Sequence, residues 1–158
     1  MPAVYWFYPK LPPSTNKIYF SRGGGRQLTD RARKYKNSLV RWLGKEIAKS
    51  GLTTFRDDVP YEVRLLFAFE REFVINKGWP KKAKSRFKKA DTTNLDKLVL
   101  DALATAIGVD DCAFFSVQLT KCISHKPGVS IVLRELFCEP DDVESRWYMD
   151  TEEVLYLE

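Results

Sequence analysis

The sequence predicts a small single domain of the α+β (α/β) class, with a mixed sheet and two main helices. Helical periodicity marks residues 29–50 and 94–106, and strand-like segments occupy residues 3–8, 61–70, 113–123 and 129–136. The chain has 158 residues, which is an ordinary size for one domain, and 44% of them are hydrophobic, which is enough for a core. We find no internal repeat and no segment with the composition of a linker.

A strand and a stiff turn are expected before the first helix. Residues 3–8, AVYWFY, are apolar and β-prone. Pro12 and Pro13 cannot continue a regular element, and the Ser-Thr-Asn that follows favours side-chain bonds to the local backbone. This turn is either a purely structural loop or a loop that contacts substrate, and in the second case Asn16 and Lys17 are candidate DNA contacts.

Residues 21–27, SRGGGRQ, place Arg22 and Arg26 on either side of three glycines. The cluster lacks the lysine and the Ser or Thr of a P-loop, so it is only a weak indication of phosphate binding. Both arginines are nevertheless candidate DNA contacts because the body of the chain is basic.

The first helix has clear start and stop signals. Thr29 is a good N-cap, and Gly51 is a good stop after Ser50. One face of this helix is apolar and predicts the core: Tyr35, Leu39, Trp42, Leu43 and Ile47. The basic residues around the rest of the helix are either a solvated face or a track for a nucleic-acid backbone.

Three further segments alternate as strands do. Residues 61–70 predict a half-buried strand, with Glu62, Arg64 and Glu70 on its polar face. Residues 113–123 also alternate, and the sequence SHKPG predicts a turn into residues 129–136. We therefore expect the last two strands to form a hairpin.

The net charge of +5 is unevenly distributed. From Glu135 to Glu158 there are nine acidic residues and one basic residue, Arg146, so this tail carries −8 and residues 1–134 carry +13. A basic body is typical of a nucleic-acid binder, because neutralisation of phosphates supplies much of the binding. The alternative is a surface that is charged only for solubility. We divide the chain into a domain at 1–135 and an acidic extension at 136–158.

The densest basic run precedes Asp91. Six of the ten residues from Lys81 to Ala90 are basic, and no acidic residue occurs between Glu72 and Asp91. Such like charges disfavour a compact element, so we expect a mobile loop that orders on a polyanion, or else simply a solvated loop. Trp79 and Phe87 lie among the charges and could stack on bases. The candidate DNA contacts of this run are Lys81, Lys82, Lys84, Arg86, Lys88 and Lys89.

The stretch Asp91 to Asp111 predicts the second helix. Thr93 and Asp96 can form a capping box, and Gly108 ends the helix. Its apolar stripe comprises Leu95, Leu98, Val99, Ala102, Leu103 and Ala106. This stripe serves either the core of the monomer or a subunit interface. Asn94, Lys97 and Asp101 share the opposite side of the helix.

Carboxylates beside a basic run suit an enzyme that hydrolyses phosphodiesters with a divalent metal, because Mg²⁺ prefers oxygen ligands. Asp91 and Asp111 are the candidate ligands, Asp110 is a supporting or alternative ligand, and Lys97 is the candidate catalytic cation. Each has an ordinary alternative role. Asp91 can be the anion at a helix start, and Asp110 and Asp111 can be turn residues. Lys97 can simply pair with Asp101 on the helix surface. Asp111 reaches Asp91 only if the helix is short or bent, or if a second subunit supplies one of them.

The pattern D-x-x-N-L-x-K-x-x-x-D-A-L from Asp91, followed by Asp110 and Asp111, resembles the RusA family of Holliday junction resolvases, found mostly in bacteriophages and prophages. The amino-terminal PPSTNKIY and the basic run before Asp91 also resemble that family. The resemblance covers residues 5 to about 135. It implies a RusA-like fold, a homodimer, and magnesium-dependent paired nicking of four-way DNA junctions in recombination and repair, with Mn²⁺ as a possible substitute.

The resemblance places the family's first and last catalytic aspartates at Asp91 and Asp111 and its lysine at Lys97, with Asn94 and Asp101 at further motif positions. The family usually has D-x-D-N, whereas this chain has Thr93 at the middle aspartate. A hydroxyl is a poorer metal ligand than a carboxylate. Two readings follow: a junction endonuclease, or a branched-DNA-binding protein with weakened or lost cleavage. A third reading is a binder of single strands or RNA.

Some classes of site and location are disfavoured by composition. His125 is the only histidine, which argues against zinc sites built on histidine pairs. The three cysteines lack metal-ligand spacing, so we expect a reduced cytoplasmic protein. Neither a signal peptide nor an apolar run of membrane-spanning length is expected.

Overall fold

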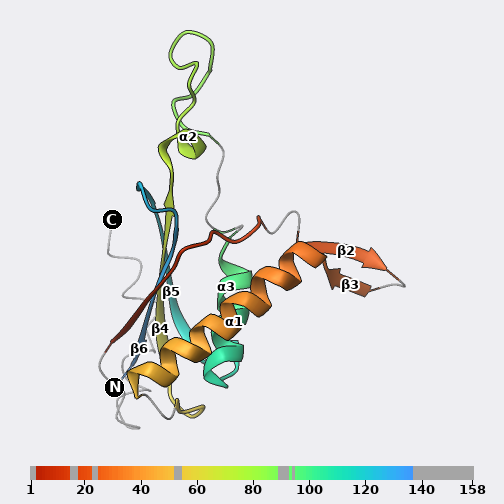
Figure 1. The fold of residues 1–158 in the computed structure, drawn as a ribbon, viewed down its shortest axis with the longest axis vertical. Coiled ribbons are helices and arrows are strands. Elements are labelled where there is room, and N and C mark those ends of the chain that lie inside the picture. Colours follow the sequence, from red (N-terminus) through yellow and green to blue (C-terminus); the bar gives the residue numbers. More distant parts are fainter. Residues whose placement is uncertain are drawn as a thin grey trace, which may run out of the picture.

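The computed structural model describes residues 3–14, 18–22, 25–51, 55–88, 93 and 95–136, with the backbone alone at 21, 22, 25 and 26 (Figure 1). It confirms the α+β class. The strands of a four-stranded sheet lie in the order β1 (Val4–Tyr8), β6 (Gly128–Glu135), β4 (Tyr61–Phe69) and β5 (Phe114–Ile123). A separate hairpin joins β2 (Tyr19–Arg22) to β3 (Gly25–Leu28), and the two main helices are α1 (Asp30–Ser50) and α3 (Asp96–Ile107).

The predicted hairpin of the last two strands is wrong. β5 and β6 do not pair with each other but lie on either side of β4, β5 parallel to it and β6 antiparallel. The turn between them passes over the end of β4, where the Ser124 amide donates to the Phe69 carbonyl at 2.8 Å. β4 lies between two neighbours, and most of its residues are buried, as suits an interior strand.

The helices form as the local signals predict, with one correction. The Thr29 hydroxyl accepts a bond from the Ala32 amide at 3.4 Å, and Gly51 ends α1 in the left-handed conformation at φ 70°. The capping box proposed for α3 is wrong, because the N-cap position is Leu95 and the helix begins at Asp96. Leu95 is buried in the core, and the Asp96 carboxylate supplies the anion of the first turn instead.

One core unites the sheet and both helices. The α3 stripe belongs to the core of the monomer: Leu98, Val99 and Leu103 are fully buried, so it cannot serve a subunit interface. In α1, Leu39 and Leu43 are fully buried. The predicted stripe residues Trp42 and Ile47 of α1 and Ala106 of α3 are only partly buried.

A tyrosine ties α1 to the first strand of the sheet. The Tyr8 hydroxyl of β1 lies 2.7 Å from the Ser38 hydroxyl of α1, and its ring packs against Tyr35 and Trp42 at centroid distances of 5.7 and 5.3 Å. Among the described residues no helix combines the length and the apolar character of a membrane span.

The polar side of β4 differs from the expected solvent face. Glu62 is only 6% exposed, although Arg64 on the same side is exposed. Its carboxylate accepts bonds from Arg64 at 3.1 Å, Gln118 at 3.0 Å and Arg134 at 2.9 Å. Neighbouring strands therefore supply the partners that allow this charge to be buried.

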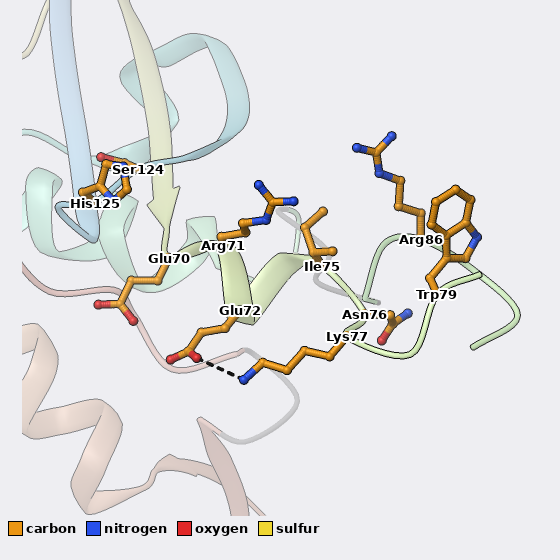
Figure 2. Close-up of a pocket in the computed structure, with 10 residues that line it drawn as sticks. All are labelled: Glu70, Arg71, Glu72, Ile75, Asn76, Lys77, Trp79, Arg86, Ser124 and His125. Carbon is orange, nitrogen blue, oxygen red and sulfur yellow. Dashed lines mark ion pairs between the residues drawn. The ribbon is translucent and has the colours of Figure 1, made fainter. Parts of the chain in front are cut away.

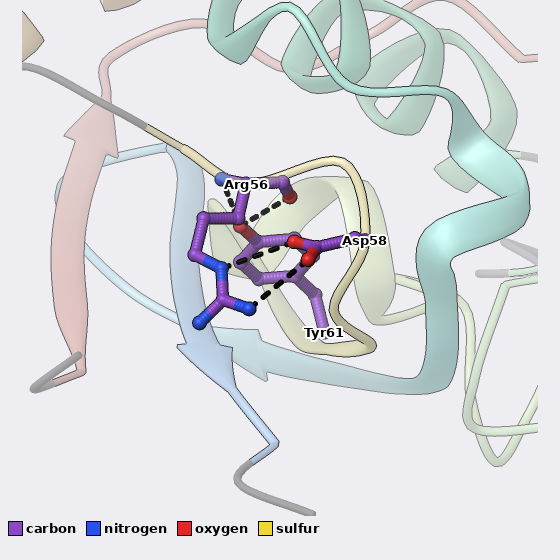
Figure 3. Close-up of polar contacts among 3 residues, drawn as sticks. All are labelled: Arg56, Asp58 and Tyr61. Atoms are coloured by element: carbon purple, nitrogen blue, oxygen red, sulfur yellow. Dashed lines mark hydrogen bonds and ion pairs between the residues drawn. The ribbon is translucent and has the colours of Figure 1, made fainter. Parts of the chain in front are cut away.

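Tyr61 anchors the chain that enters β4. Its hydroxyl donates to the Arg56 carbonyl at 2.8 Å and accepts from the Arg56 amide at 2.9 Å, and the ring is 1% exposed (Figure 3). Arg56 also forms a two-point ion pair with Asp58, and these hydrogen bonds hold the pKa of the Asp58 carboxyl below its usual range. Because Asp58 is exposed, we assign the anchoring to Tyr61 and not to this ion pair.

We expect Tyr61→Phe to lower the free energy of unfolding by about 1–3 kcal/mol, because it leaves the Arg56 amide and carbonyl without this partner. Chemical denaturation monitored by circular dichroism measures the change. Tyr5→Phe is the matched control, since Tyr5 is 62% exposed and its hydroxyl has one long contact with Ser130, at 3.2 Å. Equal effects of the two variants would contradict the anchoring role.

Candidate active site and nucleic-acid interface

The exposed side of α3 carries the predicted lysine and aspartate as a pair. The Lys97 ammonium lies 3.4 Å from Asp101 Oδ1, one turn later on the helix. The Asp101 side chain is 20% exposed and that of Lys97 is 54% exposed, so the pair lies at the surface with the carboxylate partly covered. The pKa of Lys97 is raised, chiefly by the charge of Asp101, with smaller contributions that include Tyr19 and Asp111.

A tight reversal after α3 brings the second acidic step back toward this pair. Gly108 is left-handed at φ 73°, and the Gly108 and Val109 amides both donate to the Ala104 carbonyl, at 3.0 and 3.1 Å. The chain then enters a short 3-10 turn, Asp111–Ala113. The reversal places Asp111 at the same hollow as Asp101 of α3, whereas an extended chain after the helix would carry it away.

Asp110 is held by the turn that it begins. Its Oδ1 accepts from the Cys112 amide at 3.0 Å, and this bond lowers the pKa of the carboxyl. The Asp110 carboxylate also raises the pKa of the Cys112 thiol, chiefly through a side-chain hydrogen bond. Asp110 therefore stays ionised and oriented, as a supporting carboxylate beside Asp111 would need.

Three of the predicted aspartates line one shallow hollow of about 400 Å³ beside α3. Asp101 contributes from the helix, and Asp110 and Asp111 contribute from the turn. Lys36 of α1 also lines it, one of the basic residues that the sequence predicted only as part of the charged side of that helix. Because α1 packs on α3, residues far apart in the chain meet here, and no local pattern marks Lys36.

The start of the motif is only partly described. Thr93 is exposed, in a short helical turn before α3, whereas Asp91 and Asn94 lie outside the described residues. Among residues that the structure describes, no three His, Cys, Asp or Glu side chains are grouped to hold a metal ion. The described carboxylates have the oxygen chemistry that Mg²⁺ prefers, but they do not form a complete ligand set.

The basic run lies on a loop that projects beyond the end of β4 (Figure 1). After α2 (Arg71–Val74), Ile75 forms a β-bridge with Phe87, and the Lys88 amide donates to the Val74 carbonyl at 2.7 Å. The Asn76 side chain donates to the Ser85 carbonyl at 2.8 Å, which closes the loop from inside. These bonds define its base; its mobility in solution stays a prediction.

A cation and two aromatic rings meet on this loop. The Arg86 guanidinium lies 5.6 Å from the Trp79 ring centre and 5.7 Å from that of Phe87. Trp79 and Phe87 are 46% and 57% exposed, so both remain partly accessible to a partner beside Arg86. Lys81, Lys82, Lys84 and Lys88 are exposed on the same loop, whereas Lys89 lies outside the described residues.

A cavity of about 640 Å³ lies between the loop and the turn after β5 (Figure 2). Arg86 and Trp79 line it from the loop, and Ser124 and His125 line it from the turn. A 3.5 Å ion pair between Glu72 and Lys77 lies along it. The sequence predicted the SHKPG segment only as a turn, because its proximity to the loop depends on the parallel pairing of β4 with β5.

The remaining candidate DNA contacts are incompletely placed. Arg22 and Arg26 lie on the β2–β3 hairpin, with Ser21 opposite Arg26 and Arg22 opposite Gly25. Asn16 and Lys17, in the turn before β2, lie outside the described residues.

A protein-family model matches this chain. The family model described as Endodeoxyribonuclease RusA matches residues 9–134, which is most of the chain and includes α3, the acidic turn and the basic loop. No curated protein matches the sequence. The chain therefore belongs to the RusA endodeoxyribonuclease family, and this membership implies Holliday junction resolvase activity and binding of branched DNA.

Proposed function

We propose that this protein resolves four-way DNA junctions by paired nicking, as a homodimer that uses a divalent metal ion. The observation that carries the proposal is the hollow beside α3, where the reversal at Gly108 brings Asp110 and Asp111 together with Asp101, the partner of Lys97. The hollow thus gathers three carboxylates and the Lys36 ammonium group at one place on the surface. Family membership supports the substrate and the class of reaction.

We assign Asp91 and Asp111 as ligands of Mg²⁺, with Mn²⁺ as a substitute. When bound, such an ion polarises the scissile phosphate and lowers the pKa of a coordinated water. Lys97 then stabilises the negative charge that develops on the phosphate oxygens. Asp101 acts through Lys97: its carboxylate lies 3.4 Å from the ammonium, where it positions that group and raises its pKa. Asp110 and Asn94 support the site.

A second candidate function is branched-DNA binding with weakened or lost cleavage. Thr93 favours it, because a hydroxyl replaces the carboxylate that the family motif has there and adds no charge to the metal site. Thr93 is exposed, so core packing does not dictate which side chain stands there. The two candidates differ in cleavage and agree on binding.

We expect Thr93→Asp to raise the rate of junction cleavage and to lower the Mg²⁺ concentration at half-maximal rate, because an added carboxylate helps to neutralise the ion. Asp91→Asn should abolish cleavage and leave binding intact. Both variants are measured on one synthetic four-way junction across a Mg²⁺ titration. Asp57→Asn is the control, since it removes an exposed carboxylate near the start of β4.

The outcome also separates the two functions. A wild type that binds the junction but does not cut it, and that is activated by Thr93→Asp, favours the second function. If the wild type already cuts rapidly and Thr93→Asp changes neither the rate nor the metal midpoint, another group holds the metal and the role given to Thr93 is wrong.

We assign the basic loop as the main contact with the DNA backbone. Neutralising Lys81 and Lys82 to Gln should weaken binding to every DNA and reduce the slope of log K against log salt by roughly two, because each lost duplex phosphate contact is worth about 0.9. Gel-shift titrations at several salt concentrations measure the slope. Lys45→Gln with Lys49→Gln is the matched control at the far end of α1, and equal slope changes in both pairs would contradict the assignment.

Binding of single strands or RNA is the third reading, and the exposed rings of Trp79 and Phe87 beside Arg86 favour it. Such rings stack on unpaired bases of any sequence. A competition assay discriminates: a junction resolvase should prefer the four-way junction over a single strand of equal length.

We expect a dimer in sedimentation at micromolar concentration, because a two-fold protein presents two sites to the two symmetric strands of a junction. Since the α3 stripe is buried in the monomer, the contact must use another surface. A monomer, both free and on junction DNA, would count against paired nicking.

A further inference from the structure

One face of the sheet, the inner face, packs against the helices, and the other is the outer face. On β4 and β6 the inner residues include Val63 and Leu133, which are fully buried. The outer face is defined here by Tyr5, Leu66, Val132, Gln118, Arg64 and Arg134. Tyr5 is 62% exposed, and the side chains of Arg64 and Arg134 are 51% and 49% exposed, so this face is open over three strands.

A buried carboxylate arranges the two arginines of the outer face. Glu62 accepts from Arg64 through one oxygen, at 3.1 Å, and from Arg134 through the other, at 2.9 Å. Its side chain is 7% exposed, and the Gln118 amide adds a third bond at 3.0 Å. The cluster carries one net positive charge, and each guanidinium has further N–H donors that Glu62 does not use. It is a preformed receptor for a carboxylate or phosphate.

Apolar groups lie directly beside this receptor. In the register of the sheet, Tyr5 is opposite Val132, Val132 is opposite Arg64, and Arg64 is opposite Gln118. Tyr5 and Val132 thus form one half of a row whose other half is polar. The ligand that matches this row has acidic groups next to aromatic or aliphatic side chains, which a bare phosphate backbone lacks.

The acidic extension has that composition and begins at the edge of this face. β6 ends at Glu135, one residue after Arg134, and the Leu136 amide is fixed to the Pro60 carbonyl at 2.8 Å. Residues 137–158 follow, with eight acidic residues, one arginine, and Trp147, Tyr148, Leu155 and Tyr156 among them. These 22 residues can span up to about 70 Å, so reach does not limit where they bind.

We propose that residues 137–158 dock on the outer face, with their carboxylates on Arg64 and Arg134 and their apolar side chains near Tyr5 and Val132. The family match ends at residue 134, so this device belongs to the extension and not to the shared domain. Residues 137–158 carry seven net negative charges, and docking holds them near the start of β4. The basic loop follows the other end of this strand, and Glu62 and Phe69 are roughly 23 Å apart along it. The tail is thereby kept from competing with DNA for the loop.

The test is photo-crosslinking of the full chain with p-benzoylphenylalanine in place of Tyr5, using a mixture of ¹⁵N-labelled and unlabelled protein. We expect crosslinks from position 5 to residues 137–158 within one chain, and their loss in about 1 M salt, where the Debye length is near 3 Å. The same photo-reactive residue at Phe73, on α2, is the control and should give no tail crosslink. Three outcomes would overturn the proposal: crosslinks between labelled and unlabelled chains, crosslinks to added junction DNA only, or no crosslink at all.

Variants on both sides of the contact separate docking from folding. Arg64→Gln with Arg134→Gln should abolish the crosslink, but this pair also removes partners of Glu62. The second variant therefore changes the tail alone: Glu139→Gln, Asp141→Asn, Asp142→Asn and Glu144→Gln together. It leaves the sheet untouched and should lower the crosslink yield several-fold. An unchanged yield in this tail variant contradicts the proposal.

The functional consequence is measured separately and rests on the proposed DNA-binding function. At low salt the double arginine variant should bind a four-way junction several-fold more weakly than wild type, and adding the tail variant should restore the affinity. Unchanged affinity would overturn the claim that docking keeps the tail off the DNA. Failure of the wild type to bind junctions would contradict the proposed function instead, since the crosslink needs no DNA.

Discussion

The central position of β4 is the constraint on which the remaining structure depends. Its inner side chains, Val63, Leu65 and Phe67, are almost wholly buried beneath the helices, and its backbone is paired on both sides. A strand in this place fixes its neighbours, because any slip in register would expose the apolar side chains. It also fixes its two ends: Tyr61 is its first residue, and the segment that carries the projecting basic loop follows its last (Figure 1).

The candidate site uses the second rigid element of the domain. α3 is held by a buried stripe, so Lys97 and Asp101 project from a helix that cannot rotate without breaking the core. The left-handed Gly108 then allows the chain to reverse within a few residues, which places Asp111 at the same hollow as Asp101. This placement on a rigid scaffold is what an electrostatic site for phosphodiester chemistry requires, since misplaced charges stabilise a transition state poorly.

Charge is separated along the molecule. The basic loop follows the carboxyl end of β4, whereas the Glu62 cluster and the start of the acidic extension lie near the other end of the sheet. A polyanionic substrate and an acidic segment of the same chain compete for basic groups unless they are held apart. The two arginines on Glu62 offer the extension a site that is remote from the loop and flanked by apolar groups that DNA backbone does not match.

The sequence by itself determined the elements whose causes are local. The bounds of α1 follow from Thr29 and Gly51, and the core stripe of α3 follows from helical spacing, because capping and periodicity act within a few residues. The motif from Asp91 to Asp111 could also be recognised in the sequence alone, and it indicated the family that the family model matches.

Only the tertiary structure decided which distant segments meet. Strand alternation cannot specify a partner strand, so the position of β4 between β5 and β6 was not predictable. The burial of Glu62 was not predictable either, because Arg134 and Gln118, two of its partners, come from two other strands. The start of α3 at Asp96 depends on Leu95 entering the core, which overrides the local capping signal at Thr93. Lys36 and His125 lie beside candidate sites for the same reason: burial and strand pairing, not local pattern, set the packing of α1 on α3 and of β5 on β4.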